Sequence, residues 1–158
     1  MTERTLILLK PDCMERRLAG AILSRFEQKG FRIVGMKLMQ ATPEIAAQHY
    51  AEHVEKSFYP NLLAYITSDP VTAICLEGRD VVSVVRKMVG ATKGYLAEPG
   101  TIRGDFSISG QKNLVHASDS PESATREIAI FFRPEELVSW KTSDVQIFLS
   151  PSEIAESC

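Results

Sequence analysis

The chain has 158 residues, of which 44% are hydrophobic and 24% charged, and its formal net charge is -2. That length supports a hydrophobic core without disulfides or structural metals, so we expect a single domain over residues 1–158. The small net charge gives the chain no overall basic field of the kind that binds nucleic acid.

Three cysteines, Cys13, Cys75 and Cys158, are widely spaced and odd in number. This pattern disfavours a disulfide framework and a structural zinc site, and it fits a reducing compartment. The apolar run after Met1 is too short for a secretory signal, and no stretch is long enough to span a bilayer. We therefore predict a cytoplasmic protein that does not enter membranes.

Strands and helices alternate in the first half of the chain. Residues 6–9 are a continuous apolar run that predicts a buried strand, followed by a loop at Lys10-Pro11-Asp12. Apolar residues then recur at helical spacing over 18–26, and Gly30 closes that helix. Alternation over 31–39 predicts a second strand.

The middle of the chain continues the same alternation. Thr42-Pro43-Glu44 combines a capping hydroxyl, a proline at the first helical position and an early acid, which predicts a helix start. A further short helix is expected over 61–66, and a second central strand over 71–76. Residues 81–89 could form a strand by propensity, but Asp80 and Gly90 at their ends favour a helix.

The last part begins with an irregular segment over 90–110, and a loop of this length is usually functional or disordered. Residues 114–115 predict a brief strand that leads to His116, and Ser120-Pro121-Glu122 starts the next helix. The repeated strand and helix order implies an α/β sandwich with helices covering a small sheet.

His116 is the candidate catalytic residue. It follows a short apolar run where the chain turns into a helix start, a position that holds a side chain rigidly yet within reach. Glu127 lies in the apolar face of the following helix, and a buried carboxylate needs a partner. A carboxylate on one imidazole nitrogen would leave the other free as a nucleophile. A lone histidine is otherwise more often structural.

Three basic residues do not read as solubility charges: Lys10 ends a strand, Arg86 lies on the polar face of a predicted helix, and Arg103 lies in a loop flanked by turn residues. If they converge at one end of the sheet, they form a phosphate site, because guanidinium forks and ammonium charges both bind phosphate oxygens. Thr92 and Asn113 would add neutral donors there. Taken singly, each basic residue is more simply a surface charge.

Two other sites are disfavoured. The segment from Gly90 to Gly94 has the wrong spacing for a phosphate-binding P-loop. His49 and His53 are four residues apart, so a helix could present both to a metal, but no third ligand occurs at a suitable spacing for zinc.

In combination, these segments resemble the nucleoside diphosphate kinase family over roughly residues 3–141. The most specific are Pro99-Gly100-Thr101-Ile102-Arg103-Gly104-Asp105 and Asn113-Leu114-Val115-His116-Ala117-Ser118-Asp119-Ser120, with Lys10-Pro11-Asp12, residues 26–31, His49-Tyr50, residues 58–60 and residues 134–137 in support. The resemblance implies a ferredoxin-like α/β sandwich, a βαββαβ core with a four-stranded antiparallel sheet covered by helices.

The resemblance also implies the reaction. The γ-phosphate of a nucleoside triphosphate such as ATP passes to a nucleoside diphosphate by a ping-pong route through a phosphohistidine, with Mg²⁺ bound through the nucleotide phosphates and not directly to the protein. His116 is then the nucleophile. The implied supporting residues around the reaction and the phosphates are Glu127, Ser118, Lys10, Tyr50, Arg86, Thr92, Arg103 and Asn113, while Phe58 and Leu62 flank the base.

Some positions depart from the family pattern. Cys13 and Ala117 stand where glycine is common, and we expect the added Cβ atoms to lie close to the site. Lys93-Gly94 and Gly110-Gln111 replace common family pairs in loops linked with subunit contacts and nucleotide phosphates. If exposed, Cys13 would gain thiolate character from Lys10 and become sensitive to oxidation. The alternative function is a catalytically weak nucleotide-binding or regulatory scaffold on the same fold.

The C-terminal tail, residues 142–158, carries alternating apolar residues at Val145, Ile147 and Leu149. We expect this tail to pack along a neighbouring subunit in a homo-oligomer. The resemblance favours a hexamer, and Lys93-Gly94 keeps a tetramer as the alternative.

Overall fold

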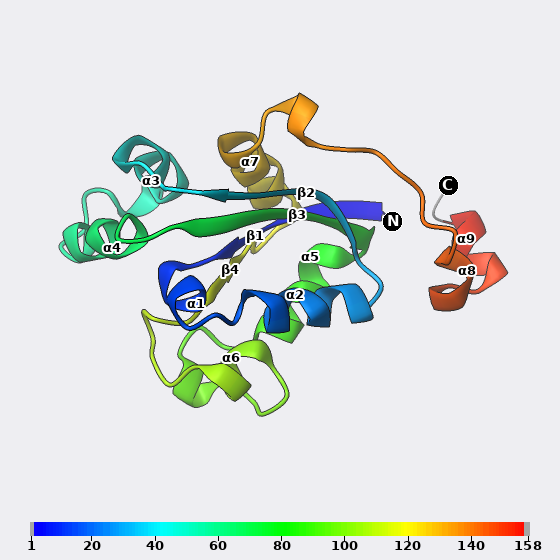
Figure 1. The fold of residues 1–158 in the computed structure, drawn as a ribbon, viewed down its shortest axis with the longest axis horizontal. Coiled ribbons are helices and arrows are strands. Elements are labelled where there is room, and N and C mark those ends of the chain that lie inside the picture. Colours follow the sequence, from blue (N-terminus) through cyan, green and yellow to red (C-terminus); the bar gives the residue numbers. More distant parts are fainter. Residues whose placement is uncertain (1, 157–158) are drawn as a thin grey trace.

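The computed structural model describes residues 2–156. Its centre is a four-stranded antiparallel sheet with the strand order β2-β3-β1-β4 (Figure 1). The strands are β1 (Thr2–Leu9), β2 (Arg32–Met39), β3 (Val71–Arg79) and β4 (Val115–Ala117). This arrangement confirms the predicted ferredoxin-like sheet.

Helices cover both faces of the sheet (Figure 1). The α-helices are α1 (Pro11–Glu15), α2 (Ala19–Gln28), α3 (Pro43–His49), α4 (Tyr59–Ile66), α5 (Val81–Val89), α6 (Ile102–Phe106), α7 (Pro121–Phe131), α8 (Val145–Phe148) and α9 (Pro151–Glu156). Short 3₁₀ turns are η1 (Ala51–His53), η2 (Gly94–Leu96) and η3 (Pro134–Glu136).

Strand β1 is apolar throughout its second half because both of its faces are covered. Ile7 and Leu9 belong to the core beneath α2 and α5, whereas Leu6 and Leu8 belong to the core beneath α3, α4 and α7. All four side chains are at most 1% exposed. The uninterrupted apolar run thus reflects a central strand between two helical layers.

Helices α3 and α7 both begin with a side-chain hydroxyl at the cap position. Thr42 Oγ1 accepts from the backbone N–H of Ile45 at 3.2 Å at the start of α3. Ser120 Oγ accepts from the N–H of Ser123 at 3.1 Å at the start of α7. Both helix starts therefore follow the predicted capping pattern.

Helix α5 forms over residues 81–89 as predicted, with Gly90 at its end at φ 87. Asp80 stands at the cap position but makes no side-chain cap hydrogen bond, and its φ is 49. A left-handed backbone is unusual for a residue other than glycine, although aspartate tolerates it better than most. The helix therefore owes its start to the apolar face of its valines rather than to Asp80.

Three local predictions were wrong or incomplete. Residues 11–15 form α1 instead of a loop, since Pro11 suits a first helical turn. The segment over 90–110 contains α6, which Thr101 caps by accepting from Gly104 N–H at 3.0 Å. The simple alternation of β2 is interrupted by a bulge between Ile33 and Gly35, which shifts the phase of its side chains.

The tail forms the short helices α8 and α9. It contacts its own chain, since Arg79 Nη1 lies 3.2 Å from Glu153 Oε1, and a Cβ at Gly30 would meet the ring of Phe148. Ile147 nevertheless remains 77% exposed. The predicted packing on a neighbouring subunit therefore stays a prediction.

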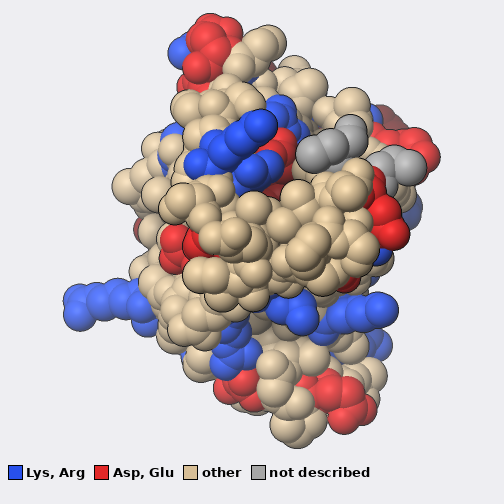
Figure 2. Space-filling view, turned by 90° about the vertical axis from the view of Figure 1, so that its right-hand side faces the viewer, with Lys and Arg blue, Asp and Glu red and all other residues tan. Residues whose placement is uncertain are grey.

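The face that Figure 2 shows is the one near the chain termini. Neutral side chains occupy its centre, and basic and acidic side chains are distributed around it. No α-helix among residues 2–156 combines the length and apolar character needed to cross a membrane.

Candidate active site

His116 lies at the centre of β4, not beyond the strand's end, and pairs with Leu8 of β1. Its Nε2 lies 2.9 Å from Glu127 Oε2 on α7, and Ser118 Oγ donates to the same carboxylate oxygen at 2.7 Å. The His116 side chain is 23% exposed and that of Glu127 is 6% exposed. Glu127 therefore holds the imidazole in place, and part of the ring remains accessible to solvent.

The Glu127 carboxylate is buried yet ionised. Burial by itself would raise its pKa, but the hydrogen bond and charge of His116 and the hydroxyl of Ser118 outweigh this and keep the pKa below its usual value. An ionised Glu127 accepts a proton-bearing Nε2, so Nδ1 of His116 carries the lone pair. Among residues 2–156, Nδ1 makes no hydrogen bond.

A second network fixes the chain just before His116. Asp12 in α1 accepts the backbone N–H of Leu114 on Oδ2 at 3.1 Å and the hydroxyl of Tyr65 on Oδ1. Leu114 has a φ of 72, an unfavourable backbone for a residue with a branched side chain. Asp12 thus stabilises a strained residue two positions before the histidine, which sequence analysis did not foresee.

Lys10 and Asn113 form the adjoining polar pair. Lys10 Nζ donates to Asn113 Oδ1 at 2.7 Å, and Asn113 Nδ2 donates to the carbonyls of Thr92 and Gly110 at 2.9 and 3.0 Å. Burial, followed by the charge of Arg103, lowers the pKa of Lys10 to about 8, and Asp12 opposes the change. Lys10 is still mostly a cation at neutral pH.

Arg103 is 4% exposed and holds the segment just before the histidine against the end of α5. It donates to the carbonyls of Asn113, Gly90 and Val115 at 3.2, 3.2 and 2.6 Å. Burial, followed by the charge of Arg86, lowers its pKa to about 10. A guanidinium has five N–H donors. Two of them remain for a phosphate, because the described residues accept only three.

Arg86 and Thr92 lie on the outside of this cluster. Arg86 is exposed on α5 and donates to the carbonyl of Ala117 at 3.4 Å, next to His116. Thr92 is exposed after the end of α5, and its carbonyl is held by Asn113. Lys10, Arg86, Arg103, Thr92 and Asn113 therefore do converge near β4, as the sequence predicted.

A series of ring contacts leads from His49, whose ring adjoins that of His116, to the predicted base-binding residue Phe58. The His49 and Tyr50 ring centroids lie 4.5 Å apart, those of Tyr50 and His53 6.4 Å, and those of His53 and Phe58 5.5 Å. Phe58 is 48% exposed. Leu62 donates its backbone N–H to the Phe58 carbonyl, one helical turn away, so the two side chains share a face.

Tyr50, the residue after α3, has an unpaired hydroxyl. Its Oη is buried and makes no hydrogen bond within the described chain. Burial, and secondarily the charge of Glu127, raises the pKa of Tyr50. The hydroxyl is therefore a neutral donor without a partner among the described residues.

His49 is the residue that sequence analysis did not connect to this site. It ends α3, is 6% exposed, and its ring meets that of His116 edge to face with centroids 4.6 Å apart. Burial, followed by the charge of His116, lowers the pKa of His49 to about 3, so the ring is neutral. His49 and His53 do not lie on one helix, because α3 ends at His49 and His53 lies in η1.

The family model described as nucleoside diphosphate kinase matches residues 3–137. The chain belongs to the nucleoside diphosphate kinase family. As a member it is an enzyme, a phosphotransferase that acts on nucleotides, and kinases of this family require a divalent cation.

Individual members of the nucleoside diphosphate kinase family are similar over most of the chain. One from Rhodopirellula baltica is 62% identical over 87% of this chain and 91% of its own length. One from Thermoplasma acidophilum is 51% identical over 94% of this chain and 100% of its own. The solved structure of a halophilic member from Halobacterium salinarum in complex with CDP has a TM-score of 0.92 at 43% identity, covering 95% of this chain and 100% of that one.

Two departures from the nucleoside diphosphate kinase pattern lie in the core. Cys13 is 0% exposed and Ala117 is 1% exposed, and both pack in the apolar cluster beneath α2 and α5. Burial, followed by the charge of Asp12, raises the pKa of the Cys13 thiol to about 12. The conditional expectation of an exposed, oxidation-prone thiolate at Cys13 is therefore not met.

The two loop departures lie at the margin of the site. Gly94 is buried against the Ser107 carbonyl, so no side chain fits there, whereas Lys93 is exposed. Gly110 and Gln111 are exposed, and the Gly110 carbonyl accepts from Asn113. Both loops thus adjoin Asn113 through backbone carbonyls, those of Thr92 and Gly110.

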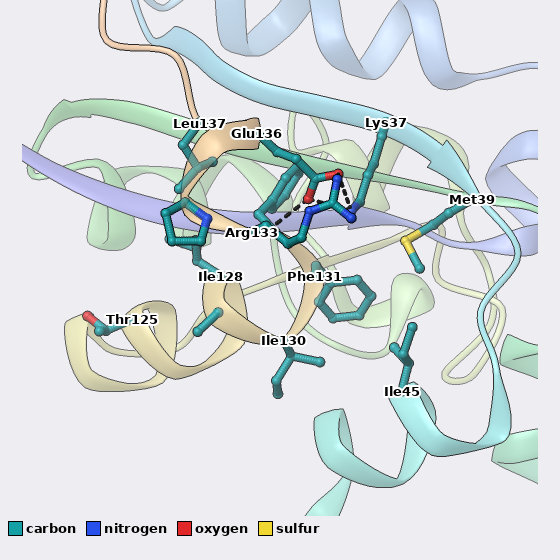
Figure 3. A pocket seen from close by; sticks show the side chains of 13 residues that line it. Lys37, Met39, Ile45, Thr125, Ile128, Ile130, Phe131, Arg133, Glu136 and Leu137 are labelled. Atoms are coloured by element: carbon teal, nitrogen blue, oxygen red, sulfur yellow. Dashed lines mark hydrogen bonds and ion pairs between the residues drawn. The ribbon is translucent and has the colours of Figure 1, made fainter.

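A separate hollow of about 520 Å³ lies between β2, α3, α7 and η3 (Figure 3). Met39, Ile45 and Ile130 give it an apolar wall, and the ion pair between Lys37 and Glu136, 2.9 Å, lies at its other side. None of the predicted site residues lines this hollow, so it lies apart from the candidate active site.

Proposed function

We propose that this enzyme transfers the γ-phosphate of a nucleoside triphosphate to a nucleoside diphosphate by a ping-pong mechanism through phosphohistidine at His116. The observation that carries the proposal is the pairing of His116 Nε2 with the buried Glu127 carboxylate, which leaves Nδ1 as a lone-pair donor.

In the first half-reaction, His116 Nδ1 attacks the γ-phosphorus. The bond from that phosphorus to the bridging oxygen breaks, and the nucleoside diphosphate leaves with the electron pair. Positive charge that develops on the ring is stabilised by ionised Glu127, which Ser118 Oγ keeps in position at 2.7 Å. Glu127 thus orients the ring and does not itself accept the phosphoryl group.

The basic residues neutralise the phosphate oxygens. Phosphoryl transfer depends mainly on positioning and charge stabilisation. Arg103 has two unused N–H donors, Lys10 is a nearby cation, and exposed Arg86 adjoins the Ala117 carbonyl. Tyr50, Thr92 and Asn113 supply neutral donors, and the unpartnered Tyr50 hydroxyl supports that role.

In the second half-reaction, a terminal oxygen of a bound nucleoside diphosphate attacks the phosphorus on Nδ1. The nitrogen to phosphorus bond breaks, and the electron pair returns to the ring. The same residues serve the donor and the acceptor in turn, since both present phosphates to one nucleophile. Release of the new triphosphate restores the starting enzyme.

We propose Mg²⁺ as the divalent cation, bound through nucleotide phosphates. Mg²⁺ takes oxygen ligands, and the one group of three candidate ligands within residues 2–156 contains two imidazoles. That group does not suit Mg²⁺ and leaves the phosphates as its ligands. When bound, the ion would neutralise phosphate charge, while the protein cations hold the remaining oxygens.

We propose broad use of nucleotides, with Phe58 and Leu62 flanking the base. An aromatic face and an aliphatic side chain contact any flat ring without a hydrogen-bond code. The complex of the Halobacterium salinarum enzyme with CDP supports nucleotide binding on this fold.

We also propose one domain over residues 1–158, a cytoplasmic location, and a homo-oligomer, hexameric with a tetramer as the alternative. Light scattering that finds a monomer at micromolar concentration would contradict the assembly.

The decisive experiment is to incubate the protein with Mg²⁺ and ATP labelled on the γ-phosphate, and to search for phosphate on the denatured chain. We expect acid-labile, base-stable label on wild type and on His53→Ala, and none on His116→Ala. Adding an unlabelled nucleoside diphosphate should then move the label to its triphosphate.

Label on His116→Ala at the wild-type level would overturn the assignment of the nucleophile. Nucleotide binding without any covalent label on wild type would instead favour the scaffold alternative.

A further inference from the structure

His49, His116 and Glu127 come from three different elements, α3, β4 and α7, and meet at one point. Each offers one ligand atom, and these atoms all lie within 4.8 Å of one another. Two imidazoles and a carboxylate are a ligand set found in open zinc sites. We propose that these residues form a binding site for a zinc-type dication, distinct from the Mg²⁺ that accompanies the nucleotide.

The unpaired ring nitrogens of His49 are an independent observation that supports this site. Both of its ring nitrogens are buried and lack a hydrogen-bond partner among the described residues. Buried polar atoms usually have partners, so an imidazole with two unused nitrogens is an exception that needs an explanation. Its ring is neutral and held between His116 and Phe131, with centroids 4.6 and 5.3 Å away. A metal would take the nitrogen lone pair without adding a buried proton.

The ligand types select the metal. Imidazole nitrogen suits Zn²⁺, Co²⁺, Ni²⁺ and Cu²⁺, whereas Mg²⁺ and Ca²⁺ take oxygen. The present spacing of up to 4.8 Å is wider than bonds of about 2.0 to 2.1 Å to one ion allow at tetrahedral angles, so at least one of the three side chains must move toward the others on binding. Three protein ligands leave a fourth position for water or a phosphate oxygen.

Metal binding would compete with phosphoryl transfer, a consequence that rests on the proposed function of His116. If the metal takes Nδ1, the nucleophilic lone pair is occupied. If it takes Nε2, the proton displaced from that nitrogen moves to Nδ1. In either case His116 can no longer attack phosphorus, so the bound dication is an inhibitor.

Nearby cations limit the affinity. Arg126 Nη2 lies 3.8 Å from Glu127 Oε1, and Lys10 and Arg126 both influence His49 electrostatically. Like charges disfavour a further dication, so we expect a dissociation constant of roughly micromolar order. Bound nucleotide phosphates would offset part of this repulsion.

The test is a titration of unphosphorylated protein with Co²⁺ alone, which absorbs visible light when bound tetrahedrally. The protein carries no affinity tag and has Cys158→Ser, so that the terminal thiol cannot bind the ion. We expect one Co²⁺ per chain, displaced by Zn²⁺. His49→Phe keeps an aromatic ring but loses the ligand, and should weaken binding at least about tenfold. His53→Phe is the matched control and should bind like wild type.

A second measurement needs no variant that could misfold. Wild-type protein treated with MgATP and freed of nucleotide should bind Co²⁺ at least about tenfold more weakly, because His116 then carries phosphate. Equal Co²⁺ affinity of wild type and folded His49→Phe, or the absence of any tetrahedral Co²⁺ spectrum below about millimolar metal, would overturn the site. If MgATP leaves no phosphate on the chain, the proposed function fails, whereas the titration of unphosphorylated protein still decides the metal site.

Discussion

The two sides of the candidate site are built differently. On the phosphate side, Asn113 and Arg103 are at most 4% exposed, and each makes several hydrogen bonds to backbone carbonyls. On the base side, Phe58 is 48% exposed, and its described neighbours are the His53 ring and the Lys56 ammonium.

The difference follows from what each side has to recognise. Reacting phosphates require charges at fixed positions, and buried side chains with satisfied hydrogen bonds supply that rigidity. A base that varies between substrates needs only a flat apolar contact. Substitutions on the phosphate side should therefore reduce the rate strongly. Substitutions on the base side should have a mild effect on substrate binding, similar for all nucleotides.

Arg103→Lys should produce the largest loss in this comparison. Lysine keeps a charge but cannot brace the carbonyls of Asn113, Gly90 and Val115 together while it also contacts a phosphate. We expect the kcat/KM of phosphoenzyme formation to fall by about 100-fold, or about 2.7 kcal/mol. Rapid-quench measurement with labelled ATP tests this, and Arg133→Lys, which alters an exposed ion pair with Glu135 at η3, is the control. A loss of kcat/KM below about threefold would show that the hydrogen bonds of Arg103 to these carbonyls are dispensable.

Glu127→Gln should be milder than loss of His116. The amide can still contact the ring, but it lacks the negative charge that stabilises positive charge developing there. We expect phosphoenzyme formation to slow by roughly tenfold, about 1.4 kcal/mol, with the stoichiometry of labelling unchanged. Rapid-quench labelling with ATP measures both the rate and the final stoichiometry. A variant that is labelled as fast as wild type would contradict this account.

The pH profile tests Lys10. With its pKa lowered to about 8, Lys10 is charged below that pH and becomes neutral as the pH rises through it. The kcat/KM of phosphoenzyme formation should therefore decline above pH about 8 and be about tenfold lower one unit higher. Lys10→Arg should move this decline to higher pH because arginine keeps its proton. An identical alkaline limb in wild type and Lys10→Arg would assign the titration to another group.

Phe58→Ala should give the smallest effect. Stacking contributes about 1 to 3 kcal/mol per base, and the exposed ring is at the lower end of that range. We expect the KM of purine and pyrimidine diphosphates to rise several-fold each, with any purine preference reduced. Steady-state assays with several ribo and deoxy diphosphates measure it, and Tyr95→Ala, which removes a ring that is 61% exposed from another loop, is the control. A thousandfold selectivity for one base, about 4 kcal/mol, would reveal a base-reading group that is missing from this description.

The sequence by itself determined the alternation of strands and helices, the caps at Thr42 and Ser120, and the burial of Glu127. These features depend on local periodicity and on side chains close in the chain, which a linear pattern contains. The segments that resemble nucleoside diphosphate kinases also identified the family, which the comparisons confirm.

Tertiary structure alone decided which distant groups meet. The contact of Asp12 with Tyr65 and with Leu114, and that of His49 with His116, join residues from different elements and leave no periodic signal. Burial lowers the pKa of Lys10 and raises that of Cys13, because the depth of a side chain depends on how the helical layers close over the sheet. A strand's order in the sheet, and hence the neighbours of its side chains, is a property of the packed chain as a whole.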